Sequence, residues 1–193
     1  MDTGRMEAFS DGVIAIIITI MVLGMMEVPL KGADWNALKP VWPVFLGYVL
    51  SFIYVGIYWN NHHHMLSVVR HVNGRVLWAN LHLLFWLSLF PFVTAWAGEH
   101  RFTTVPSVLY GVVLLMAAVA YVILQRSIIA FEGHDSALAR ATGRDLKGKI
   151  SPALYALGIG LAFVNGWASN AIYLLVALIW LVPDRRIEAR VTQ

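Results

Sequence analysis

The stretch from Ala8 to Met26 is an almost unbroken run of apolar residues, and with its flanks it is about long enough to cross a lipid bilayer as a helix. The composition of the whole chain agrees with this interpretation. Of the 193 residues, 59% are hydrophobic and 13% are charged, whereas about a quarter of the residues of a soluble domain are charged. These features predict an all-α integral membrane protein.

The composition also argues against several other classes of protein. The sequence contains no cysteine, which excludes disulfides, thiol redox chemistry and thiolate metal sites. The formal net charge of +3 would be weak evidence for nucleic-acid binding in a soluble chain, but here basic cytoplasmic loops explain it better. The first apolar run is too long for a cleavable signal peptide, and residues 24–27 make a poor cleavage site.

The chain contains six apolar segments, which we expect to form six transmembrane helices in a single domain over residues 1–193. Pro91 lies inside the third segment and should kink it. Asn165 and Gly166 separate the last two segments, which predicts an antiparallel hairpin of two short helices. The predicted helices cover residues 7–26, 41–66, 76–97, 105–130, 150–165 and 168–183.

Basic residues predict the orientation of these helices, because cytoplasmic loops carry an excess of Lys and Arg. With both termini on one side, that side holds eleven Lys and Arg residues and the other side holds three. The distribution predicts a multi-pass plasma-membrane protein with both termini in the cytoplasm. The eleven are Arg5, Arg70, Arg75, Arg126, Arg140, Arg144, Lys147, Lys149, Arg185, Arg186 and Arg190, and the three are Lys31, Lys39 and Arg101.

The first predicted helix has two different faces. At about 100° per residue, one stripe of it is mostly apolar with a single hydroxyl, and Asp11 lies on the opposite face. One interpretation of the stripe is a packing face against neighbouring helices. The other is a pore lining in which apolar side chains meet at a symmetry axis and close the pore by dewetting, which requires an oligomer. The stripe comprises Arg5, Phe9, Gly12, Ile16, Thr19 and Leu23.

Arg5-x-x-x-Phe9-Ser10-Asp11 is followed by WNNHHH at residues 59–64 and NLHLLFWLSLFPFVTAW at residues 80–96. In this order, the three segments resemble the RxxxFSD signature and the second and third helices of the bacterial relatives of the endolysosomal potassium channel (the transmembrane protein 175 family). The resemblance covers essentially the whole chain. It implies a homotetramer in the lipid bilayer, with one six-helix unit per chain and the first helix around a central potassium-selective pore.

The resemblance also implies which side chains line that pore, namely Ile16, Thr19, Ile20 and Leu23, with Ile16 at the narrow apolar constriction. The carbonyl filter sequence TVGYG of ordinary potassium channels is absent. Selection among ions would therefore depend on apolar and hydroxyl side chains, with potassium permeating near Ile16 and Thr19. No cofactor and no fixed metal ion are expected.

A second group of polar residues is expected where the first three helices meet at the cytoplasmic end. Buried Asp11 would need hydrogen-bond donors, which histidines, Asn80 or the indole of Trp59 or Trp86 can supply. The resemblance implies that this network is structural and holds the pore helix in place. The alternative is a proton relay through Asp11 and the histidines. The predicted network comprises Arg5, Phe9, Ser10, Asp11, His63, His64, Asn80 and Trp86.

Two further functions are weaker. The adjacent histidines 62–64 point about 100° apart on a helix, so they cannot all bind one metal ion, and no nucleophile-and-base pair predicts an enzyme. A proton-coupled secondary transporter would use Asp11 and the histidines. However, the sequence has neither an inverted repeat nor a pair of interrupted apolar segments, which such carriers usually show.

Overall fold

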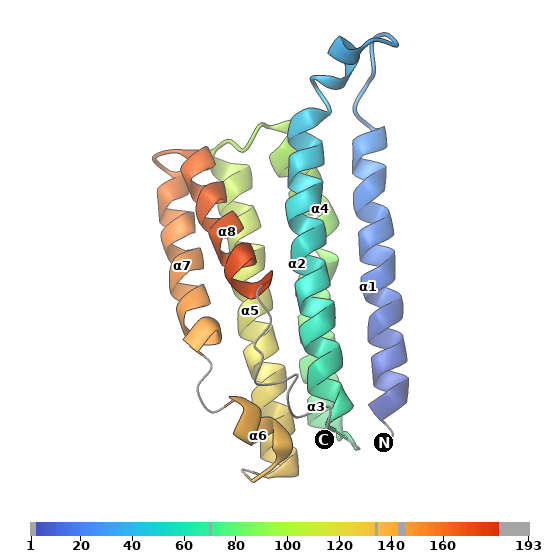
Figure 1. Cartoon of the computed structure of the whole chain (residues 1–193), viewed down its shortest axis with the longest axis vertical. Helices are drawn as coiled ribbons and strands as arrows, with labels where there is room; N and C mark the ends of the chain where they lie inside the picture. The colour runs from blue at the N-terminus through green and yellow to red at the C-terminus, as the bar shows by residue number, and fades with distance from the viewer. Residues whose placement is uncertain (1–2, 70, 134, 143–145, 182–193) are drawn as a thin grey trace.

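The computed structural model describes residues 3–69, 71–133, 135–142 and 146–181. It is a bundle of α-helices that run side by side, and α1 stands at one edge of it (Figure 1). The prediction of an all-α chain with several apolar helices is confirmed. The helices are α1 (Thr3–Met26), α2 (Trp42–Ser67), α3 (Gly74–Ser88), α4 (Phe90–Glu99), α5 (Thr104–Glu132), α6 (Ala137–Thr142), α7 (Leu146–Ala162) and α8 (Gly166–Leu181), with a short 3-10 helix at Trp35–Leu38.

Four helical spans in the described residues are long and apolar enough to cross a membrane: α1, α2, α3 together with α4, and α5. The last two helices are shorter, since α7 has 17 residues and α8 has 16. At 1.5 Å per residue they are about 25 Å long, which is less than the roughly 30 Å of a bilayer's hydrocarbon core. The length of α7 and α8 is therefore not sufficient to identify them as membrane-spanning helices.

The third predicted helix is divided into α3 and α4 around Leu89, two residues before Pro91. Proline has no backbone N–H to donate to the carbonyl of Leu87, and its ring would collide with that carbonyl in a continuous helix. Pro91 instead lies in the first turn of α4, where its missing N–H costs nothing. The expected kink thus appears as a one-residue interruption of the helix at Leu89.

The position of α2 in the bundle is fixed by buried hydroxyl groups. The Ser51 hydroxyl lies 2.5 Å from that of Thr94 on α4 and 2.8 Å from that of Tyr110 on α5. The Tyr54 hydroxyl donates to the backbone oxygen of Tyr173 on α8, at 2.6 Å. Because buried hydroxyls lose free energy when unpaired, these contacts restrain how α2 can shift against α4, α5 and α8.

The α7–α8 hairpin closes around Tyr173, whose side chain is fully buried. The Asn165 side chain accepts from the Trp167 amide at 2.9 Å and so caps the start of α8. A Cβ atom at Gly158 on α7 would lie 2.4 Å from the Tyr173 ring. Gly158 is therefore a packing residue, because only a residue without a side chain lets α7 and α8 approach this closely.

Two glycines of α7 give a matched test of this packing. We expect Gly158→Ala to destabilise the protein by about 1–3 kcal/mol, since the added methyl group overlaps the Tyr173 ring. A Cβ atom at Gly160 would meet nothing within 4 Å, so Gly160→Ala should be neutral or slightly stabilising. Thermal unfolding of the purified variants in detergent measures both, and equal melting temperatures would contradict the packing role of Gly158.

Candidate functional site

Helix α1 buries one face and leaves the other uncovered. Its buried side chains pack on α2, α3 and α4, and they are Thr3, Met6, Ser10, Ile14, Ile17 and Met21. The predicted stripe lies on the uncovered side: Ile16 is 59% exposed, Ile20 46% and Leu23 52% in the single chain. The stripe is thus not a packing face within the subunit. If it packs against helices, they belong to other molecules.

Thr19 lies in the middle of the uncovered stripe. Its hydroxyl donates a hydrogen bond to the backbone oxygen of Ala15, one turn earlier, at 2.9 Å. A hydroxyl whose hydrogen is used inside the helix still has lone pairs on its oxygen. Because the side chain is exposed, it presents an oxygen acceptor to whatever lies on that side.

A buried chain of hydrogen bonds joins α1 to α3 and α2. The Ser10 hydroxyl donates to the Met6 backbone oxygen at 2.8 Å and accepts from the Asn80 amide nitrogen at 2.9 Å. The amide oxygen of Asn80 then lies 2.8 Å from Nε2 of His62. Since that oxygen can only accept, Nε2 of His62 carries the hydrogen. Ser10, Asn80 and His62 are each at most 1% exposed, so the chain lies in the protein core.

Two acidic residues of α1 contact two aromatic residues of α2. The Trp59 indole nitrogen donates to the Asp11 carboxylate at 3.0 Å, and Nδ1 of His63 lies 2.8 Å from the Glu7 carboxylate. The rings of Trp59 and His63 stack at 6.2 Å. Glu7 and Asp11 are four residues apart, as are Trp59 and His63, so each pair lies on one face of its helix. Because α1 and α2 run antiparallel, the first residue of one pair meets the second residue of the other.

The structure brings only part of the predicted network together. Trp86 donates to His82 on its own helix at 3.0 Å, and not to Asp11. The His64 ring lies against His63, with centroids 5.8 Å apart. Phe9 is 55% exposed, and Arg5 is exposed and forms no hydrogen bond with another described residue. These side chains are therefore not partners of the Asp11 carboxylate in the subunit.

Glu7 and His62 were missing from the predicted network. The sequence does contain a signal for Glu7, because the pairs Glu7/Asp11 and Trp59/His63 share the four-residue spacing of a helix face. No comparable signal identifies His62 among three adjacent histidines. Its role depends on the rotation of α2, which points His62 at Asn80 and His63 at Glu7. The three rings thus diverge, as their spacing predicts.

Trp59→Phe tests the contact between α2 and Asp11. The change removes the indole donor and keeps an aromatic ring, so Asp11 loses its partner. Because both side chains are partly exposed, water compensates in part, and we expect a loss of about 1 kcal/mol in the free energy of unfolding. Trp78→Phe is the control, since Trp78 is 75% exposed on α3. Equal thermal unfolding of the two variants would refute a stabilising role for this contact.

Comparisons with known proteins extend over nearly the whole chain. A family model described as "Endosomal/lysosomal potassium channel TMEM175" matches residues 5–91. A protein of Chryseobacterium sp. (strain P1-3), named a potassium channel, is 55% identical over 97% of each chain. A potassium channel of Streptomyces collinus is 35% identical, over 92% of this chain and 90% of its own.

Animal relatives and a solved structure complete the comparison. The human endosomal/lysosomal proton channel TMEM175 is 41% identical over 76 residues, which is 34% of this chain and 15% of the human one. The crystal structure of a lysosomal potassium-selective channel TMEM175 homolog from Chamaesiphon minutus matches with a TM-score of 0.76 and 27% identity. The match covers 93% of this chain and 96% of that chain.

The sequence match and the structural match both include the helices that carry the candidate site. The family model covers α1, α2 and α3, which carry the Ser10–Asn80–His62 chain and the two acidic contacts, and the solved structure shares the arrangement of almost the entire bundle. The expected resemblance is therefore confirmed, as is the prediction that the chain is an ion-channel relative and not an enzyme. The chain is a multi-pass membrane protein that belongs to the TMEM175 family.

Proposed function

We propose that the chain is one subunit of a homotetrameric potassium-selective channel in a bacterial plasma membrane. Two bacterial relatives that match over at least 90% of their own length are named potassium channels, and the structural relative is described as potassium-selective. The carrying observation is the uncovered side of α1, which leaves this helix free to line an axis shared by four copies. This side carries the stripe residues Gly12, Ile16, Thr19 and Leu23 together with Ile20.

In this proposal, side chains of α1 both close the pore and select the ion that passes through it. Four copies of Ile16 around the axis form an apolar ring, which excludes water and thereby raises the barrier to a hydrated cation. One turn along, four Thr19 hydroxyls present their oxygen lone pairs, because their hydrogens are bonded to Ala15. These oxygens replace part of the hydration shell of a potassium ion as it passes.

The polar contacts of α1 serve to hold the pore helix. Helix α1 has a free side toward the axis, so its rotation is set by contacts on its other side. The buried Ser10–Asn80–His62 chain fixes that side in the N-terminal part of α1, and Glu7 and Asp11 attach the same turns to α2. A change in rotation of about 100° would replace Ile16 by its neighbour at the constriction, so these contacts determine which side chains form the ring.

The proposal includes six membrane crossings with both termini in the cytoplasm. Helices α7 and α8 form the last two crossings, and their short length is met by burial against α5 and by local thinning of the bilayer. The excess of Lys and Arg on one side supports the orientation. The end of the bundle at which α1 begins then faces the cytoplasm, and the α1–α2 connection faces outwards (Figure 1).

Purified protein in liposomes under opposed potassium and sodium gradients tests this function. We expect a current whose reversal potential lies near the potassium equilibrium value and does not move with a pH gradient. A reversal potential that follows sodium and potassium equally would refute selectivity. Counter-flow that tracks protons without current would instead indicate a carrier.

Proton conduction is the second candidate, and one observation favours it. The animal relatives that match 34% of this chain are named proton channels. In this chain a relay from Asp11 to the histidines is interrupted, because Asp11 bonds to the Trp59 indole, which donates but cannot accept a proton. Glu7 and His63 form the one direct carboxylate–imidazole contact among the described residues. A reversal potential that follows the pH gradient, and loses this dependence in His63→Gln, would support conduction through that pair.

A further inference from the structure

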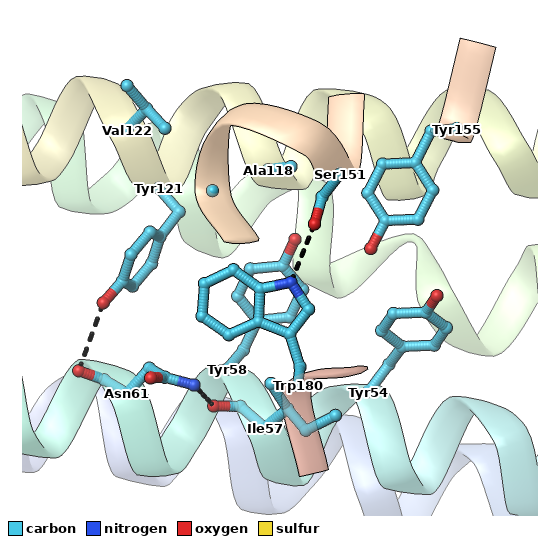
Figure 2. Close-up of a pocket in the computed structure, with 11 residues that line it drawn as sticks. Tyr54, Ile57, Tyr58, Asn61, Ala118, Tyr121, Val122, Ser151, Tyr155 and Trp180 are labelled. Atoms are coloured by element: carbon cyan, nitrogen blue, oxygen red, sulfur yellow. Dashed lines mark hydrogen bonds between the residues drawn. The ribbon is translucent and has the colours of Figure 1, made fainter. Parts of the chain in front are cut away.

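A pocket lies on the far side of α2 from the pore helix, between α2, α5 and the ends of α7 and α8 (Figure 2). It has a volume of about 40 Å³. On the criterion that one water needs about 10–15 Å³ of such space, it holds about three waters, or one end of a larger molecule that extends out through the open side of the pocket. The lining residues are Tyr54, Ile57, Tyr58, Asn61, Ala118, Tyr121, Val122, Gly148, Ser151, Tyr155 and Trp180.

The pocket exists because large rings hold α2 and α5 apart. Tyr58 on α2 and Tyr121 on α5 meet edge to face, with ring centroids 6.2 Å apart. The Tyr121 hydroxyl donates to the backbone oxygen of Asn61 at 3.3 Å, and Trp180 donates to the Ser151 hydroxyl at 2.8 Å (Figure 2). These two bonds tie the walls together, so the space is a built feature of the helix packing and not a gap between loose helices.

One hydroxyl group of the pocket has no partner among the residues that the structure describes. Tyr58 is 8% exposed, and its hydroxyl forms no hydrogen bond with any residue that the structure describes. The hydroxyl oxygen is not fully shielded, so it can bond to water or to a ligand that enters the pocket. Three other hydroxyls of the lining are engaged, since Tyr54 donates to the Tyr173 backbone, Tyr121 to the Asn61 backbone and Ser151 to the Lys147 backbone. The Tyr58 hydroxyl can thus bind a ligand from outside the chain.

The lining determines the chemistry of that ligand. Every lining side chain is neutral, and five of them are aromatic rings, so a charged ligand would gain no ion pair to offset its desolvation. The remaining features favour an apolar ring or short branch with one hydrogen-bonding oxygen. We propose that this pocket binds small neutral phenols or alcohols that partition into the membrane, with Tyr58 as the hydrogen-bonding partner and Trp180 as one wall.

The position of the pocket couples it to the pore helix, an inference that rests on the proposed channel function. Tyr58 and Asn61 alternate along α2 with Trp59 and His62, which hold α1 through Asp11 and through Asn80. A ligand that pushes Tyr58 away from Tyr121 must shift or rotate this turn of α2. The contacts on the opposite face then move with it, so ligand binding should change the potassium flux.

Quenching of tryptophan fluorescence by 4-bromophenol tests the pocket on the purified full chain. Bromine quenches an indole that it touches, and we expect a saturable component from Trp180. This component should disappear in Trp180→Phe and persist in Trp167→Phe, which changes an exposed indole at the other end of α8. Tyr58→Phe should weaken the apparent affinity about fivefold through the lost hydrogen bond. Tyr48→Phe, on the same helix outside the pocket, should leave it unchanged.

Ala118→Leu provides a second, independent test, because it fills the pocket and keeps Trp180. Loss of the saturable component in this variant supports the site. Quenching that rises linearly and equally in all variants would mean partition into the bilayer only, and would overturn the proposal.

Potassium flux into liposomes is measured in parallel. Addition of 4-bromophenol is expected to change the flux through the wild type and to leave the flux through Ala118→Leu unchanged. Saturable quenching with unchanged flux would overturn the coupling to α1. Saturable quenching in a protein that conducts no potassium would refute the channel and leave the pocket standing.

Discussion

Ile16→Asn is expected to raise potassium flux through the reconstituted protein by roughly tenfold, which corresponds to a barrier lowered by about 1.4 kcal/mol. Four isoleucines at a constriction exclude water, whereas four carboxamides hydrate it and remove the dewetted segment. The fold of the subunit should be unaffected, because Ile16 is 59% exposed in the single chain and lies outside the hydrophobic core cluster. Single-channel recording or a liposome flux assay gives the measurement.

Two control variants distinguish an effect on the pore from a general loss of folded protein. Ile16→Leu keeps the apolar ring and should leave the flux close to that of the wild type. Ile17→Asn changes the adjacent isoleucine, which is 3% exposed against α2 and α4, so it should lower the yield of folded protein without opening the pore. An unchanged flux in Ile16→Asn, with normal assembly, would count against Ile16 as the constriction.

Asn80→Leu is expected to have the largest effect on stability. It removes the donor to Ser10 and the acceptor for His62 together, while it keeps a side chain of similar size. A buried group that loses its partner costs about 1–3 kcal/mol, so the free energy of unfolding should fall by roughly 3 kcal/mol. Thermal unfolding in detergent and the fraction that elutes as an assembled oligomer measure the loss.

Asn60→Leu is the matched control for this change. Asn60 is exposed on α2, and it forms no hydrogen bond with a described residue. Its replacement should leave both the melting temperature and the oligomer fraction within error of the wild type. If Asn80→Leu behaved in the same way, the buried chain would have no structural role, and the rotation of α1 would have to be set by Glu7, Asp11 and the buried apolar side chains of α1.

The helices and the special face of α1 could be predicted without a structure. Long apolar runs leave few alternatives to helices in a membrane, and a stripe at 100° per residue follows from helix geometry. The uncovered positions Ile16, Thr19 and Leu23 therefore agree with the stripe predicted from the sequence. Pro91 likewise marked the place where the third helix is interrupted, because its effect is local and steric.

Partners across helices were harder to predict. Asp11 required a donor, and the sequence offered two indoles and several histidines at a similar depth. Trp59 is the one that contacts it, and Trp86 bonds within its own helix to His82. Such a choice depends on the rotation and offset of α2 and α3 relative to α1, which the packing of the whole bundle sets.

The sequence by itself determined the membrane setting, the approximate helices and the two faces of α1, since each of these follows from apolar length and helical periodicity. Only the tertiary structure decided that His62 bonds to Asn80 and His63 to Glu7, and that Tyr58 lines a pocket between α2, α5, α7 and α8. The reason is physical: periodicity specifies directions around one helix axis, whereas a contact also requires the relative rotation and separation of two helices, which side chains throughout the core determine together.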